Sequence, residues 1–102
     1  MLAIGAQFEG KSSTATLSSV GVSASSTTVL AANANRLGAI IMNDSTAVLY
    51  LKFGTTASTS SFTYKISGGE TLELPTQPVY TGIIAGIWAS DAGGNARVTE
   101  LT

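Results

Sequence analysis

The amino-acid sequence predicts an all-β protein, a single small antiparallel β-sandwich or barrel of about seven or eight short strands. Short β-branched or aromatic runs are separated by turn residues about every 8–12 positions, which is typical of such folds. Gly, Ser, Thr and Val recur too often for a sustained helical stripe. A chain of 102 residues fits one domain with one modest core.

Eight runs have the composition of strands, and turn residues lie between them. The stretch 31–35 contains two asparagines and is too short for a helix, so we interpret it as a turn. The small polar residues of 54–61 indicate a surface loop. The expected strands cover residues 14–22, 26–31, 36–43, 47–53, 62–66, 71–74, 82–89 and 97–102.

The turn chemistry also suggests how strands connect. Residues 43–46 are rich in side chains that bond the local backbone, and we expect them to link two paired strands. Residues 68–69 are two glycines and predict a tight hairpin. Residues 91–95 predict a loop tip between the last two strands. Pro75 and Pro78 cannot donate to a ladder, so they should bound an edge.

Alternation along the strands predicts which side chains face the core. Leu49, Leu51 and Phe53 should point inward, with Tyr50 and Lys52 outward. In the same way, the alternation places Phe62, Tyr64 and Ile66 on one side of their strand and Leu72 and Leu74 on one side of theirs.

Two segments, residues 38–42 and 83–88, are apolar on both faces. A sandwich buries only one face of each sheet, so the second face needs a cover, and a subunit contact is the simplest. We therefore expect self-association as a dimer or trimer, with Tyr80, Ile84 and Trp88 near the contact.

The first residues differ from the rest. We divide the chain into an N-terminal arm, residues 1–12, and a β-sandwich domain, residues 13–102. The arm carries Leu2, Ile4 and Phe8 ahead of a Gly-Lys-Ser-Ser linker, and a free terminus of this kind would expose them to water. Docking of the arm on another subunit or shell is one interpretation, and an ordinary first strand in the chain's own sheet is the other.

The sequence lacks the equipment of most catalytic and metal sites. It has no histidine and no cysteine, and its six acidic residues are scattered. Glu70 and Glu73, three apart, fall on opposite faces of a strand. Residues 5–12 match the phosphate-loop pattern formally but lack the preceding strand and following helix that its mechanism needs. We expect no enzyme, cofactor or metal.

Charge points in the same direction. Charged residues make up 11% of the chain and the net charge is −1. This composition does not provide the basic patch that binding to nucleic acid or to an acidic membrane surface needs. No apolar stretch is long enough to cross a membrane and no signal peptide is recognisable, so we expect a soluble product of the cytoplasm. Near-zero net charge favours association, which suits a protein packed in an assembly.

Several short sequence segments are similar to segments of small proteins of tailed bacteriophages. They are residues 30–41 (LAANANRLGAII), 43–54 (NDSTAVLYLKFG), 79–88 (VYTGIIAGIW) and 94–102 (GNARVTELT), and the likeness spans about residues 27 to 102. The chain resembles the β-sandwich proteins that decorate or cement phage capsids.

That resemblance implies a virion protein on the capsid surface, made in the host cytoplasm. Its partners would be the major capsid protein and further copies of itself. The alternative is a glycan- or receptor-binding module of a phage fibre or head fibre, because Tyr50, Tyr64, Tyr80 and Trp88 would suit a platform for sugars. Whether Tyr50, Tyr80 and Trp88 are exposed or buried discriminates between the two.

Overall fold

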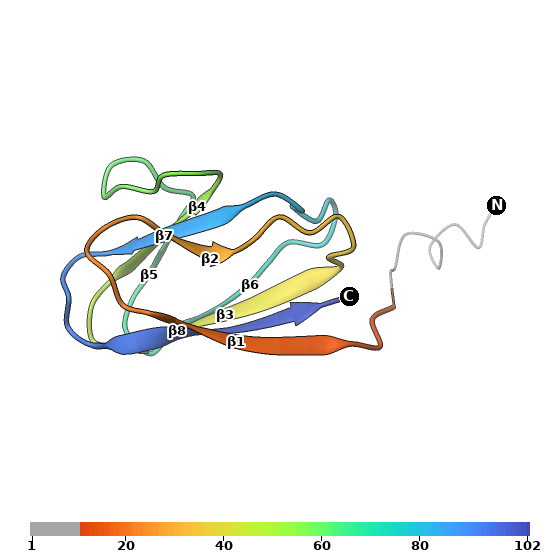
Figure 1. The fold of residues 1–102 in the computed structure, drawn as a ribbon, viewed down its shortest axis with the longest axis horizontal. Coiled ribbons are helices and arrows are strands. Elements are labelled where there is room, and N and C mark those ends of the chain that lie inside the picture. Colours follow the sequence, from red (N-terminus) through yellow and green to blue (C-terminus); the bar gives the residue numbers. More distant parts are fainter. Residues whose placement is uncertain (1–10) are drawn as a thin grey trace.

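The computed structural model describes residues 11–102, and these form two antiparallel four-stranded sheets packed face to face (Figure 1). The predicted all-β sandwich is confirmed, and each of the eight expected runs overlaps a strand, although β3 continues past the expected end at residue 43 and β8 begins before the expected start at residue 97. The strands are β1 (Ala15–Gly21), β2 (Thr27–Leu30), β3 (Gly38–Ser45), β4 (Leu49–Phe53), β5 (Tyr64–Ile66), β6 (Thr71–Glu73), β7 (Ile84–Trp88) and β8 (Gly94–Leu101).

The strand order defines the topology. Sheet A has the order β1-β8-β3-β6, and sheet B has the order β2-β7-β4-β5. This is the strand order of a jelly roll, in which two Greek keys fold over each other. Of the seven connections between consecutive strands, only that from β4 to β5 stays within one sheet. The chain therefore crosses the sandwich at nearly every turn.

Two predicted connections are wrong. Residues 43–46 do not link paired strands, because β3 lies in sheet A and β4 in sheet B. Residues 68–69 do not form a hairpin, since β5 and β6 are edge strands of opposite sheets. The turn residues were recognised correctly, but a turn signal fixes only where the chain reverses and not which strand the next one joins.

The core lies between the inner faces of the two sheets. Leu49, Leu51 and half-buried Phe53 point into it, and Tyr50 and Lys52 point outward, as predicted. Phe62 differs from its prediction because β5 begins only at Tyr64, and Phe62 packs instead on Tyr50. The large apolar side chains with at most 1% exposure are Ile41, Leu49, Leu51, Ile84, Trp88 and Val98.

The outer face of β7 has an unexpected cover. Ala85 points away from the core yet is only 3% exposed. The segment between β4 and β5 lies over this side of sheet B (Figure 1), where the Nζ of Lys52 donates to the hydroxyl of Ser61 at 2.9 Å. Ala57, 3% exposed, donates its backbone N–H to the Ser26 hydroxyl at 2.9 Å. The chain's own loop therefore accounts for the doubly apolar strand that suggested a subunit contact.

Gly86 of β7 is required by the packing of the core. A Cβ added there would lie 2.7 Å from Cγ2 of Val29 and 3.1 Å from Cδ1 of Leu49. Both distances are too short for carbon atoms, so any larger residue has to displace core side chains.

Gly86→Ala is expected to lower the free energy of unfolding by about 1–3 kcal/mol, because overpacking forces neighbours out of their preferred rotamers. Gly21→Ala in β1 is the control, since an added Cβ meets nothing within 4 Å there. Urea titrations followed by tryptophan fluorescence give both values. Equal midpoints for the two variants would contradict this account of the core.

Candidate functional site

The residues singled out from the sequence do not gather into one site. Leu2, Ile4 and Phe8 lie outside the described residues. Ile84 and Trp88 are 0% and 1% exposed and belong to the core, so they have no surface to offer a second copy. Their burial removes the reason for placing a self-association contact there. Self-association itself stays a prediction, and its contact has to be sought elsewhere.

Tyr80 is half-buried between strands and loops. Its ring stacks on Phe53 with centroids 4.6 Å apart, and its hydroxyl donates to the carbonyl of Ile83 at 3.0 Å. Tyr64 meets Phe53 edge to face at 5.7 Å. These aromatic rings therefore pack against each other at the margin of the core.

Trp88 is held by a buried asparagine. Its indole N–H donates to Oδ1 of Asn43 at 3.1 Å, and the hydroxyl of Ser45 donates to the same oxygen at 2.7 Å. Nδ2 of Asn43 donates to the carbonyls of Ala47 at 2.7 Å and Ile66 at 2.9 Å. Asn43 is fully buried with all its hydrogen-bonding capacity used. This cluster joins β3 of sheet A to β5 and β7 of sheet B.

A second buried cluster surrounds Arg36, whose side chain is 0% exposed. Nε donates to Oε2 of Glu100 at 2.8 Å. Nη1 donates to the carbonyls of Tyr80 and Gly82 at 2.8 and 3.1 Å, and Nη2 donates to that of Ala31 at 2.6 Å. The planar guanidinium suits such a divergent set of acceptors. It ties together β8 and two loops.

Sequence reasoning missed both clusters. Arg36 stood only as the first residue of an expected strand, and its partner Glu100 lies 64 positions away. The local signal was the asparagine-rich turn before it, where Asn33 Oδ1 accepts the N–H of Asn35 at 3.0 Å. Nδ2 of Asn33 also donates to Oε1 of Glu100 at 3.2 Å. No local pattern reveals a contact of such long range.

Neither cluster offers chemistry to a substrate. Each buried polar atom of the two clusters has a fixed hydrogen-bond partner, whereas a nucleophile or general base needs access to reacting atoms. Among residues 11–102, no three His, Cys, Asp or Glu side chains come together to hold a metal ion. Glu70 stabilises the turn in which it lies, since its Oε1 accepts the N–H of Ser67 at 2.8 Å.

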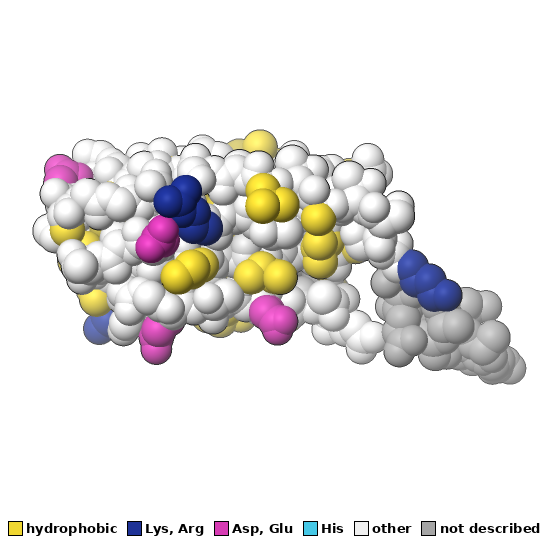
Figure 2. All heavy atoms as spheres, turned by 90° about the horizontal axis from the view of Figure 1, so that it is seen from below, with side chains coloured by type: hydrophobic (Ala, Val, Ile, Leu, Met, Phe, Trp, Pro, Cys, Tyr) yellow, Lys and Arg dark blue, Asp and Glu magenta, His cyan; other side chains and the backbone are white. Residues whose placement is uncertain are grey.

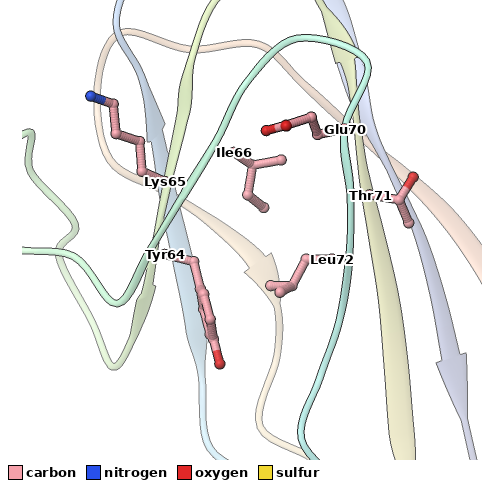
Figure 3. Close-up of a pocket in the computed structure, with 6 residues that line it drawn as sticks. All are labelled: Tyr64, Lys65, Ile66, Glu70, Thr71 and Leu72. Carbon is pink, nitrogen blue, oxygen red and sulfur yellow. The ribbon is translucent and has the colours of Figure 1, made fainter.

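An open cleft of about 320 Å³ lies between the edge strands β5 and β6 (Figure 3). Ile66 and Leu72 lie in the opening between these segments, while Lys65 and Thr71 point away to opposite sides (Figure 3). The carboxylate of Glu70 is directed toward the opening (Figure 3), where its Oε1 accepts the N–H of Ser67. The cleft is therefore a gap at the sandwich edge above the core with one carboxylate beside it.

The outer face of sheet A carries exposed apolar side chains. Leu17 of β1 and Ile40 of β3 are 74% and 36% exposed, and both stand opposite Thr99 of β8 in the register. The half-buried Met42 and Leu101 point to the same side. Figure 2 shows several separate apolar groups on this face, with polar atoms between them and a few charged side chains beside them. We call Leu17, Ile40, Met42 and Leu101 the sheet A patch.

The outer face of sheet B carries an aromatic pair. The rings of Tyr50 and Phe62 meet edge to face with centroids 4.9 Å apart, and Phe62 is 40% exposed. Nζ of Lys65 lies 5.9 Å from the Tyr50 centroid. This pair is a smaller exposed apolar surface on the opposite side of the molecule.

Comparison of the chain with models of known protein families, with curated proteins and with solved structures finds no match. Within residues 11–102 there is also no helix that could cross a membrane. The case for function therefore depends on the surfaces described above.

Arg36→Ala is expected to lower the free energy of unfolding by about 3–5 kcal/mol, because it removes the cation that pairs with Glu100 and leaves three carbonyl groups without their donor. Arg97→Ala is the matched control. Its ion pair with Asp44, 3.0 Å from Nε to Oδ2, is about half exposed, and such pairs contribute at most about 1 kcal/mol. Urea unfolding measures both variants, and a loss for Arg97→Ala as large as for Arg36→Ala would contradict the assignment.

Proposed function

We propose that this chain is a structural protein of a bacteriophage virion that binds the assembled capsid shell and stabilises it, as a decoration or cement protein. The observation that carries the proposal is the sheet A patch, an exposed apolar surface on a chain with few charges. Apolar side chains exposed together on one face of a sheet are a candidate interaction surface.

The fold is compatible with this role. Eight-stranded jelly rolls occur in viral capsid proteins and also in lectins, so the architecture alone favours neither candidate. The polar groups of the two buried clusters are held by fixed partners inside the protein, which suits a protein that binds and does not react. The resemblance of residues 27 to 102 to phage decoration proteins supports the same conclusion.

The mechanism is stabilisation by binding. The sheet A patch would pack on major capsid protein at junctions between capsomers, with Leu2, Ile4 and Phe8 of the N-terminal arm adding apolar contacts. A ligand that binds only the assembled state stabilises it by about 2.7 kcal/mol per site at a hundredfold excess over Kd. Many copies on one shell would add their contributions.

Ile40→Lys tests the contact surface, with Phe62→Lys as the matched control on the opposite face; the two residues are 36% and 40% exposed. We expect Ile40→Lys to raise the Kd for purified heads at least about tenfold, because a charge is desolvated in an apolar contact. Phe62→Lys should bind like the unaltered protein. Co-sedimentation with heads over a concentration series measures both.

Melting of the heads tests the stabilising role itself. Heads saturated with the protein should melt at a higher temperature than bare heads, and heads mixed with Ile40→Lys at the same concentration should melt like bare heads. Equal melting at full occupancy would contradict a cement role.

The second candidate function is glycan binding, which the pair of exposed Phe62 and half-buried Tyr50 on the outer face of sheet B favours. An aromatic face next to Lys65 would suit stacking on a sugar ring, although Trp88 is buried and cannot contribute. In this case Phe62→Lys should abolish binding to host surface polysaccharide while Ile40→Lys retains it. The same two variants therefore separate the candidates by opposite outcomes.

A further inference from the structure

The sandwich has four edge strands, and three of them resist pairing with another chain. Unpaired strand edges are templates for association, and proteins protect them by shortness, charge, proline or bulges. β5 has three residues, including the exposed Lys65. β6 has three residues, with Glu73 on it and Pro75 just beyond. β2 has four residues and a register shift between Thr28 and Leu30.

The fourth edge strand, β1, has none of these protections. It runs for seven residues, ATLSSVG, without a charge or a proline. Its register with β8 is unbroken from Ala15 opposite Leu101 to Gly21 opposite Asn95. Leu17 in its middle is 74% exposed. A long, regular, neutral edge with an exposed leucine is the kind of edge that recruits another strand.

The hydrogen bonds at the ends of β1 show which backbone groups are free. Thr102 donates its N–H to the carbonyl of Thr14, and Val22 donates its N–H to the carbonyl of Gly94. Because antiparallel bonding repeats every two residues, even-numbered residues of β1 bond β8. The N–H and C=O groups of Ala15, Leu17, Ser19 and Gly21 therefore point away from the sheet, at the spacing that a further strand needs.

We propose that β1 pairs with β1 of a second copy of this chain, antiparallel about a two-fold axis, so that sheet A continues across both molecules. The edge is self-complementary because it carries no charge to repel its own copy. Antiparallel pairing also brings opposite charges together at the ends. Lys11 precedes the strand, and Asp91, whose Oδ1 accepts the N–H of Ala24 at 2.7 Å, lies beyond its other end.

Full overlap of the two strands fixes the register. Each Leu17 then stands opposite Ser19 of the second copy, and Ser18 meets Ser18 across the axis at a position without backbone bonds between the pair. Cα atoms at such a position are about 4.5 Å apart, within the range that a disulfide bridges. The proposed dimer depends on the β1 edge alone, so its test is independent of the test of capsid binding.

Ser18→Cys tests the register, because the chain has no cysteine of its own. We expect mild oxidation to convert it to a covalent dimer that thiol reagents reverse. Thr71→Cys, on the exposed edge strand β6, is the control and should stay predominantly monomeric on denaturing gels. Cross-linking of Ser18→Cys at no more than the rate of Thr71→Cys would overturn the proposal.

Leu17→Lys tests the edge in the full chain without a covalent bond. Size exclusion with light scattering should give the unaltered protein, at tens of micromolar, twice the 10.3 kDa mass of one chain. Leu17→Lys should raise the dissociation constant at least about tenfold, since it sets like charges close together across the axis. Phe62→Lys, equally a charge in place of an exposed apolar residue, should leave the dimer intact. Circular dichroism melting confirms that the variants remain folded.

Two outcomes would overturn the proposal. A monomer at these concentrations would mean that the edge has no partner strand from a second copy, including the case in which residues 1–10 of the same chain cover it. A dimer that persists in Leu17→Lys and does not cross-link through Ser18→Cys would place the contact elsewhere on the surface.

Discussion

The buried guanidinium of Arg36 is the interaction on which the rest of the fold depends. A buried cation is costly unless it is paired and hydrogen-bonded, and here Glu100 and the carbonyls of two loops supply those partners in one arrangement of the chain. The Asn43–Trp88 cluster has the same property near the other end of β3. The Asn43 cluster binds β3 to strands of sheet B, and the Arg36 cluster binds β8 to two loops that connect the sheets, so together they hold the two layers in one relative position. We infer that these clusters contribute uniqueness of structure more than net stability, since a buried ion pair by itself is weak evidence for stability.

The contrast between strands and topology shows what could be predicted. All eight strands and the turn before Arg36 followed from β-branched runs and turn residues, which act over a few positions. Sheet membership did not follow, because residues 43–46 reverse the chain in the same way whether or not the next strand pairs with the last. The choice is made by contacts such as Asn43 to Ile66 and to Trp88, 23 and 45 positions away. A single sequence gives no local sign of them.

The candidate surfaces were predicted in part for a similar reason. Residues 38–42 and 83–88 both showed apolar side chains on two faces, and both were expected to need a cover. In β7 the cover is the chain's own loop, which buries Ala85 and Ala57 to 3% exposure. In β3 no described segment covers Ile40, and the sheet A patch remains exposed. The covering loop has the polar, small-residue composition of any surface loop, so its packing could not be recognised before the sandwich was assembled. A segment that is apolar on both faces can therefore be covered by the chain's own loop or remain exposed, and only the structure distinguishes the two cases.

A rigid, nearly uncharged sandwich also limits how this protein can recognise a partner. The buried polar side chains of the described residues have internal partners and three of the four sheet edges are protected, so binding falls to the outer faces and to the β1 edge. With a net charge of −1 there is little long-range steering, and discrimination has to come from contact. A regular strand edge provides this through backbone hydrogen bonds in a fixed register, and an apolar face provides it through shape. Because both belong to the hydrogen-bonded sheet A, association loses little conformational entropy, and a larger share of the contact energy appears as affinity. Continuous pairing of sheet A across two copies would place two sheet A patches on one surface, so a partner that meets both gains from effective concentration as well as from area.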